Sequence, residues 1–143
     1  MKYLCLAYEE EKKLNALSKV EWEVLRGETL AYLEELRKNG CLIAAEPLQS
    51  VRTAATVRVR DGKVSRTDGP FAETKELIAG YTIIQAKSRE EAIEWTRRFP
   101  NPAVDGKAGE IEVRQLFELD DFEPSEAIER FRDLEASLAK AKA

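Results

Sequence analysis

Histidine is absent from the sequence of 143 residues. Its absence excludes Ser-His-Asp and Cys-His catalysis, imidazole general bases and every metal site that needs a histidine ligand. Proline and glycine are also scarce, with five and seven residues, so no low-complexity linker is expected. A chain of this length is predicted to form one core and to bury ~70% of the surface that its unfolded form exposes.

Long apolar runs are missing as well, since no segment approaches the ~20 apolar residues of a membrane span. The start of the chain, Met1–Tyr8, is too short for a signal peptide. The two cysteines, Cys5 and Cys41, lie in apolar runs and are expected to be buried thiols. Without a secretion signal, a disulfide is not expected, and the sequence predicts a cytoplasmic protein.

The chain also lacks a basic field. It carries 27 acidic and 23 basic side chains, with a formal net charge of −4, and acids and bases are interleaved along it. Binding to a nucleic-acid backbone requires clustered positive charge, so nucleic acid is not expected as a partner.

What the sequence does contain is a regular alternation of strand and helix patterns. Apolar residues at steps of two predict strands, and apolar residues at steps of three and four predict helices. The strands are expected at 2–8, 41–45, 56–60, 63–67, 77–86 and 110–119, and the helices at 18–39, at 88–99 and around the stripe from Ala127 to Leu138.

Several local signals place the ends of these elements. Ser18 with Glu21 and Ser88 with Glu91 fit capping boxes that begin two of the helices. Asp61-Gly62 lies between two alternating segments, which predicts a two-residue hairpin turn with Val59 opposite Val64. Gly27 interrupts the first long helical pattern, so that helix is expected to start late or to bend there.

The order of elements predicts an α+β fold. It is close to a ferredoxin-like subunit with an antiparallel sheet, an inserted β-hairpin and an additional C-terminal helix. Two helices cover only one face of such a sheet, yet the strands at 2–8 and 77–86 are apolar on both faces. The second face must be covered by the terminal helix or by another copy, and we expect a homodimer whose sheets meet face to face.

A nine-residue run after the hairpin resembles a known family. Asp68-Gly-Pro-Phe-Ala-Glu-Thr-Lys-Glu76 is similar to the signature of the YCII-related family, in its DGPF subgroup. Supporting matches are Val57-Arg58 with Asp61-Gly62, Ala92-Ile-Glu-Trp95 and Glu112-Val-Arg114. The chain departs from the family pattern where Gln115 replaces a usual proline and where a His-Asp pair of wider relatives lacks its histidine.

The resemblance covers residues 1–119 and implies a ferredoxin-like domain that pairs as a dimeric α/β barrel. The helical stripe after this domain predicts a helical extension over residues 120–143. The resemblance also implies a largely uncharacterised function, with genomic linkage to sigma factors of the extracytoplasmic-function type. Any chemistry that depends on the histidine of wider relatives does not carry over.

The signature run itself has two interpretations. Pro70 and Gly69 predict a rigid turn in which Asp68 accepts a backbone hydrogen bond and Phe71 anchors the loop in the core. The alternative is a binding loop, which the charges of Glu73, Lys75 and Glu76 favour because a turn does not require them.

A cleft between sheet and helices, or between two sheets, is the expected place for a site. Arginine side chains there suit a carboxylate or phosphate, and a buried acid suits a general base. The candidate catalytic residues are Asp68 and Glu76, and the candidate ligand-binding residues are Arg58, Arg66, Glu73, Lys75, Tyr81, Glu112 and Arg114.

Two functions therefore remain open from the sequence. One is binding or transformation of a small anionic organic molecule in the cleft of a dimeric barrel. The other is a non-catalytic regulatory module linked to sigma-factor-dependent transcription, with the helix around Phe131, Leu134 and Leu138 docking on a sigma-factor-related partner. No cofactor is expected, and no metal site either, because the acids of the signature run lack the spacing of a hard-cation site.

Overall fold

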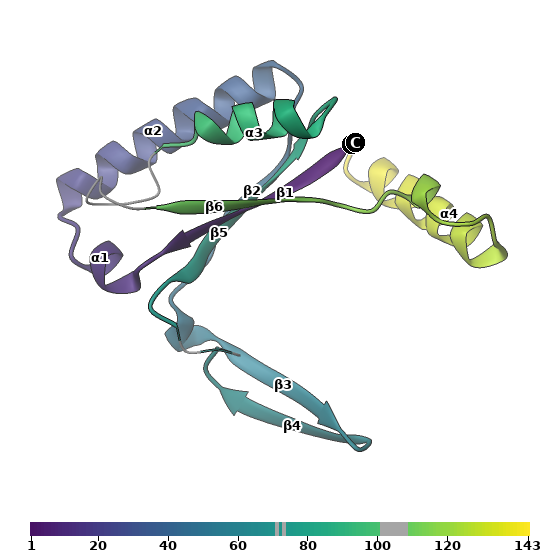
Figure 1. Ribbon diagram of the computed structural model, residues 1–143, viewed down its shortest axis with the longest axis horizontal. Helices are drawn as coiled ribbons and strands as arrows, with labels where there is room; N and C mark the ends of the chain where they lie inside the picture. Colours follow the sequence, from purple (N-terminus) through teal and green to yellow (C-terminus); the bar gives the residue numbers. More distant parts are fainter. Residues whose placement is uncertain (71, 73, 101–108) are drawn as a thin grey trace.

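The computed structural model describes residues 1–70, 72, 74–100 and 109–143 (Figure 1). Its strands are β1 (Lys2–Glu9), β2 (Leu42–Pro47), β3 (Ala55–Arg60), β4 (Lys63–Asp68), β5 (Leu77–Gln85) and β6 (Glu110–Gln115). Its α-helices are α1 (Glu11–Asn15), α2 (Lys19–Lys38), α3 (Arg89–Arg97) and α4 (Glu126–Ala141). Among these helices, none combines the length and apolar character that crossing a membrane requires.

Four strands form one antiparallel sheet in the order β2-β5-β1-β6. Helix α2 connects β1 to β2, and α3 connects β5 to β6; in each case one other strand lies between the two connected strands in the sheet. This is the ferredoxin-like arrangement predicted from the sequence. Strands β3 and β4 pair only with each other and form the predicted hairpin, inserted between β2 and β5. The fold is therefore α+β, as expected.

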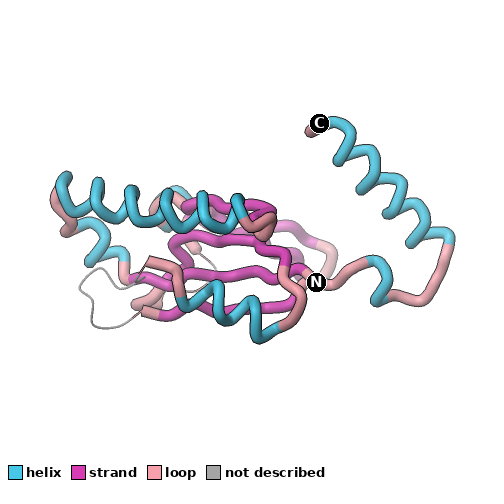
Figure 2. The backbone as a smooth tube through the Cα atoms, turned by 90° about the horizontal axis from the view of Figure 1, so that it is seen from above, coloured by secondary structure: helices cyan, strands magenta, loops and turns pink. Residues whose placement is uncertain are grey.

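Helices α2 and α3 lie on the same face of the sheet (Figures 1 and 2). Between them and the sheet lies the core, in which Leu36 and Ile84 have no exposed surface. The core side chains are Tyr3, Cys5, Tyr32, Leu36, Cys41, Ile84, Ala86, Ala92 and Trp95. Both cysteines are buried free thiols, as predicted, and burial raises the pKa of the Cys5 thiol.

The predicted helix starts agree with the structure. Ser18 and Glu21 form a complete capping box at α2, and the Ser88 side chain accepts a hydrogen bond from the Glu91 backbone N–H at α3. Helix α2 nevertheless runs from Lys19 through Gly27 without a break. Of the two expectations at Gly27, a late start or a bend, the late start is therefore wrong. Packing of the α2 core stripe outweighs the helix propensity that one glycine removes.

The hairpin also has the predicted register. Val59 lies opposite Val64, and Arg58 lies opposite Ser65. Asp61 and Gly62 both have positive φ angles, 51° and 75°, which is the backbone of the two-residue type I′ turn. The sequence identified this turn because its chemistry depends only on neighbouring residues.

Strand β6 is shorter than the sequence pattern predicted. It ends at Gln115, and a short 3₁₀ helix at Leu119–Asp121 follows. The partner strand β1 begins at Lys2, whose carbonyl oxygen accepts the last hydrogen bond from the Leu116 N–H at 2.8 Å. Beyond this point β1 offers no further backbone, so Phe117 is exposed instead of lying in a sheet.

The face of the sheet opposite the helices is open in the single chain. Two rows of side chains cross it, from the edge strand β2 to the edge strand β6. One row joins Glu46, Tyr81, Leu6 and Glu112, and the other joins Ala44, Ile83, Leu4 and Arg114. The middle of this open face is apolar and half-buried, and its charged groups lie at the two edges.

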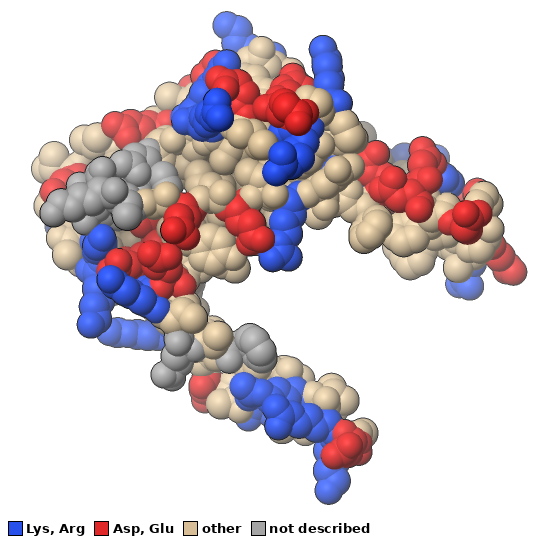
Figure 3. Space-filling view, viewed as in Figure 1, with Lys and Arg blue, Asp and Glu red and all other residues tan. Residues whose placement is uncertain are grey.

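The hairpin β3–β4 and helix α4 project from the sheet on either side of the hollow beneath its open face (Figures 1 and 3). Helix α4 does not cover the open face, which was one of the two covers expected from the sequence. Lys and Arg side chains gather on the hairpin, and Asp and Glu side chains gather on the C-terminal segment (Figure 3).

Candidate functional site

Three polar side chains form a hydrogen-bonded cluster at the β6 edge of the open face. The Tyr8 hydroxyl of β1 donates to Oε2 of Glu112 at 3.1 Å. The Nε of Arg114 donates to Oε1 of the same carboxylate at 2.6 Å. Glu112 and Arg114 are two residues apart on β6, so strand alternation places both on one face. We call these three residues the Tyr8 cluster.

The hydrogen bonds of the Tyr8 cluster fix its protonation. The Arg114 guanidinium, followed by the Tyr8 hydroxyl, lowers the pKa of Glu112 by stabilising the carboxylate. The same carboxylate raises the pKa of Tyr8, because deprotonation would remove the hydrogen bond and add a second negative charge. It also raises the pKa of Arg114. Near neutral pH the cluster holds a charged pair and a protonated phenol, which suits recognition better than proton abstraction.

A groove of about 730 Å³ adjoins the Tyr8 cluster. Its lining includes Tyr8 and Glu112 together with Lys75, Glu76 and Glu110. The Lys75 amine lies 3.3 Å from a carboxylate oxygen of Glu10. Glu10 directly follows the C-terminal end of β1. Carboxylates outnumber amines in this groove, so an anionic group is repelled from the groove itself.

The structure brings several of the predicted site residues together. Lys75, Glu76 and Glu112 line the groove, and Arg114 lies beside it in the Tyr8 cluster. Tyr81 lies on the same open face, opposite Leu6, which in turn lies opposite Glu112. Glu76 is therefore the one candidate catalytic carboxylate that lies next to this cluster.

The remaining predicted residues lie on the hairpin or outside the described residues. Arg66 forms an ion pair of 2.8 Å with Asp68, and Arg58 donates to the Thr67 hydroxyl at 3.1 Å. The side chains of Arg58, Arg66 and Asp68 are exposed, and they line neither of the grooves described in this section. Glu73, the last of the predicted set, is outside the described residues.

The signature run begins with a backbone turn that needs glycine. Gly69 has a φ angle of 113°, a conformation that residues with a side chain rarely adopt. Its N–H donates to the Ala54 carbonyl oxygen and its own carbonyl oxygen accepts from the Thr56 hydroxyl, both at 2.8 Å. These bonds fit the interpretation of a stiff connector at the base of the hairpin; the expected anchor, Phe71, lies outside the described residues.

Sequence reasoning missed Tyr8 as a member of the site. The alternation of β1 places Tyr8 on the same face as Leu4 and Leu6, a signal present in the sequence. The pairing of β1 with β6, which joins residues more than a hundred positions apart, is what brings Tyr8 to Glu112. No local pattern carries that information.

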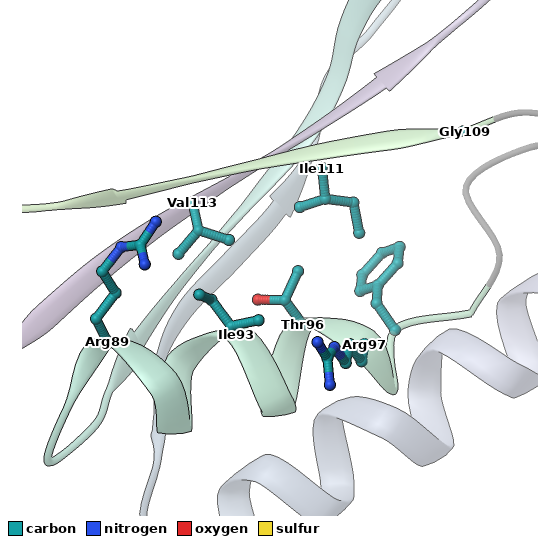
Figure 4. Close-up of a pocket in the computed structure, with 8 residues that line it drawn as sticks. Arg89, Ile93, Thr96, Arg97, Gly109, Ile111 and Val113 are labelled. Atoms are coloured by element: carbon teal, nitrogen blue, oxygen red, sulfur yellow. The ribbon is translucent and has the colours of Figure 1, made fainter.

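A second groove, of about 620 Å³, lies on the helix side between α3 and β6 (Figure 4). Ile93 and Thr96 of α3 point into it, and so do Ile111 and Val113 of β6 (Figure 4). Most of these side chains are half-buried and continue the margin of the core. None of the predicted site residues lies there, so we assign the candidate site to the open face.

The donor set of the open face does not resemble a metal centre. In the part of the chain that the structure describes, no three acidic or cysteine side chains are arranged to hold a metal ion. Glu112 already uses both carboxylate oxygens in hydrogen bonds. What the arrangement offers a ligand is an apolar surface, the phenols of Tyr8 and Tyr81 and the guanidinium of Arg114.

Comparison with known proteins places this arrangement in a family. The family model described as the YCII-related domain matches residues 1–120. A protein of Rhizobium meliloti (strain 1021), named only as uncharacterised, is 34% identical over 116 residues, which cover 81% of this chain and 92% of that protein. The matched region includes the sheet, both covering helices and the Tyr8 cluster. The chain therefore belongs to the family of proteins that contain the YCII-related domain.

Proposed function

We propose that the open face binds a small organic molecule that has an apolar body and one carboxylate or similar anionic group. The anionic group pairs with Arg114, and the apolar body lies on the middle of the sheet, over Leu4, Leu6 and Ile83. The single observation that carries this proposal is the anchoring of the Arg114 guanidinium at the border of an apolar surface.

The geometry of Arg114 supports this assignment. Its Nε is held by Glu112 at 2.6 Å, which orients the planar guanidinium. Among the residues that the structure describes, no hydrogen bond or ion pair uses its two terminal nitrogens. A guanidinium with one nitrogen anchored and two available suits a carboxylate, because the two groups are planar and form paired hydrogen bonds.

The proposal includes a homodimer in which two open faces meet. The half-buried side chains of Leu4, Leu6 and Ile83 remain in contact with solvent in the single chain. A second sheet would remove this surface from water, and exclusion of water would strengthen the contact between Arg114 and an anion. A closed two-fold pair is the simplest assembly that covers both faces at once.

Ligand screening with an arginine variant tests the function. Wild-type protein is screened by thermal shift and by NMR titration against small aromatic and aliphatic monocarboxylic acids, with the corresponding neutral amides as ligand controls. We expect some acids, but not their amides, to stabilise the wild type, and Arg114→Gln to weaken their binding at least tenfold.

Arg26→Gln is the matched control variant. Arg26 also pairs with a carboxylate of its own element, Glu23 at 3.7 Å, and its side chain is 66% exposed like that of Arg114, but it lies on α2, on the other side of the sheet. Acids that bind Arg114→Gln as tightly as wild type would contradict the proposed site. Equal binding of acids and amides would contradict the anionic class of ligand.

A second candidate function is a protein-interaction module. The exposed apolar stripe of α4, formed by Phe131, Leu134 and Leu138, favours a protein–protein contact. A sigma-factor-related partner remains a prediction from the family resemblance. A complex of the purified protein with such a factor, abolished by Leu134→Lys, would support this second function; absence of a complex at micromolar concentrations would contradict it.

A further inference from the structure

Three valines on one face of the hairpin β3–β4 are not covered by any of the residues that the structure describes. The register places the side chains of Val57, Val59 and Val64 on this face, with Arg66 opposite Val57. These three side chains are between 64 and 70% exposed. An isolated two-stranded hairpin is only marginally stable in water, so a ribbon of this kind needs a surface to pack against.

Helix α4 also carries an exposed apolar stripe. Phe131, Leu134 and Leu138 form one stripe along it, and each is 53 or 54% exposed. None of the sixteen residues of α4 is buried. Helices in proteins gain most of their stability from packing an apolar face, so α4 also needs a surface to cover its stripe.

The two surfaces do not meet within one chain. The hairpin and α4 lie on different sides of the hollow beneath the open face (Figures 1 and 3). Helix α4 packs on the 3₁₀ segment before it, where Arg132 forms an ion pair of 2.7 Å with Asp120. In this position α4 lies away from its own hairpin (Figure 1).

The charges of the two surfaces are opposite. The hairpin carries four basic and two acidic side chains: Arg58, Arg60, Lys63 and Arg66 against Asp61 and Asp68. Residues 118–129, which lead into α4 and form its first turn, carry six acidic and no basic side chains. A two-stranded ribbon is narrow, so charges on both of its faces lie within the ~8 Å over which salt leaves attraction effective.

We propose that α4 of one copy packs on the β3–β4 hairpin of a second copy. The apolar stripe of the helix covers the three valines, and the acidic segment 118–129 lies near the basic ribbon. Two-fold symmetry forms the contact twice, so each copy gains a cover for both surfaces. This reciprocal packing, which we call the exchange, rests on the homodimer proposed above. It specifies that α4 and the hairpin form contacts between the two subunits.

Charge substitutions in the full chain test the exchange. Leu134→Lys places a charge in the α4 stripe, and Leu30→Lys is its matched control, since Leu30 is 58% exposed on α2. Val64→Lys and the neighbouring Ser65→Lys form a second pair, because these residues lie on opposite faces of the ribbon. All four positions are exposed, so the variants are expected to fold, which circular dichroism verifies.

Two measurements are made on each variant. Sedimentation velocity gives the dimer dissociation constant, and hydrogen exchange gives the rates of the hairpin amides over residues 55–68. We expect Leu134→Lys and Val64→Lys to raise the dissociation constant at least tenfold and to accelerate hairpin exchange, while both controls stay within twofold of wild type. Salt is expected to weaken the wild-type dimer.

Each contrary result has a defined meaning. An unchanged dissociation constant in Leu134→Lys would overturn the proposed packing of α4 on the partner's hairpin. The same packing would be overturned if the dimer of this variant is weakened but hydrogen exchange of its hairpin amides is unaffected. These results leave the homodimer and Arg114-dependent ligand binding intact. Conversely, ligand binding that does not depend on Arg114, in a protein whose hairpin amides stay protected from hydrogen exchange, would contradict the proposed function. It would leave the packing of α4 on the partner's hairpin in place. A wild-type monomer at micromolar concentration would remove the exchange and the homodimer together.

Discussion

The Tyr32 hydroxyl of α2 donates a hydrogen bond of 3.0 Å to the carbonyl oxygen of Trp95 in α3. Both side chains are buried, so this bond joins the two helices from inside the core. The pKa of Tyr32 is raised, and burial is the largest cause of this rise. The phenol therefore stays protonated and able to donate. The Tyr32 ring also contacts Phe99 edge to face, with ring centroids 5.2 Å apart.

Tyr32→Phe is expected to lower the free energy of unfolding by about 1 kcal/mol. The loss stays modest because the Trp95 carbonyl oxygen also accepts from the Arg98 N–H at 3.1 Å and keeps one partner. Urea unfolding followed by circular dichroism measures the change. Tyr81→Phe, on the open face, is the control and is expected to stay within about 0.5 kcal/mol of wild type.

Leu36→Ala is expected to lower the free energy of unfolding by about 2–5 kcal/mol, because Leu36 is fully buried and truncation leaves a cavity. Leu30→Ala changes the same side chain at an exposed position of the same helix and is expected to cost less than about 0.5 kcal/mol. Chemical denaturation of the two variants measures the difference. Similar losses in both would show that α2 does not pack as the structure has it.

Gly27→Ala is expected to stabilise the protein by about 0.5–1 kcal/mol. Gly27 lies inside α2, and an added Cβ would meet no atom within 4 Å. Gly69→Ala is the contrasting variant, since its space is equally open but its φ angle of 113° strains any residue with a side chain. Thermal unfolding should therefore shift upward for the first variant and downward for the second.

The pKa of Glu112 is expected to rise in both Arg114→Gln and Tyr8→Phe, and more in the first, because the Arg114 bond lowers it most. A lowered pKa means that the cluster stabilises the fold above the ordinary glutamate pKa and loses this effect as pH falls through the lowered value. Carboxyl-carbon NMR titration measures the pKa of Glu112 in the wild type and in the two variants. A larger rise in Tyr8→Phe than in Arg114→Gln would contradict the order of the two contributions.

Elements of the fold that depend on neighbouring residues were predicted well from the sequence. The capping box at Ser18, the Ser88 cap and the turn at Asp61-Gly62 need only a few adjacent residues to form. At Ser88 the predicted box is half formed, because the Glu91 carboxylate accepts from the Lys87 N–H. The apolar runs at 2–8, 41–45 and 77–86 and the alternation at 110–119 similarly predicted the four sheet strands in their order along the chain. The end of β6 at Gln115 was not predictable in this way, because it is set by where β1 begins.

The site was predicted only in part for the same reason. Glu112, Arg114, Lys75 and Glu76 lie together because β6 and the segment before β5 both adjoin β1. The arginines of the hairpin were grouped with them on strand alternation alone, and the structure places that ribbon outside the sheet. Anion binding and the homodimer stay predictions, since each depends on a molecule that one chain does not contain.

The pairing of β1 with β5 shifts by one residue between Ala7 and Tyr8, so that Ala7 faces Gly80 and Tyr8 faces Ile78. The extra residue is Ala79, whose carbonyl oxygen accepts from the Leu48 N–H at 2.8 Å. Uninterrupted alternation would have put Ile78 among the helix-facing side chains; the bulge turns it to the side of Tyr8 instead. Losing or gaining one amino acid at this point would swap Leu77 and Ile78 between inside and outside without touching the rest of the sheet. Which side chain lies beside the Tyr8 hydroxyl therefore depends on the number of residues in β5 as well as on their identity.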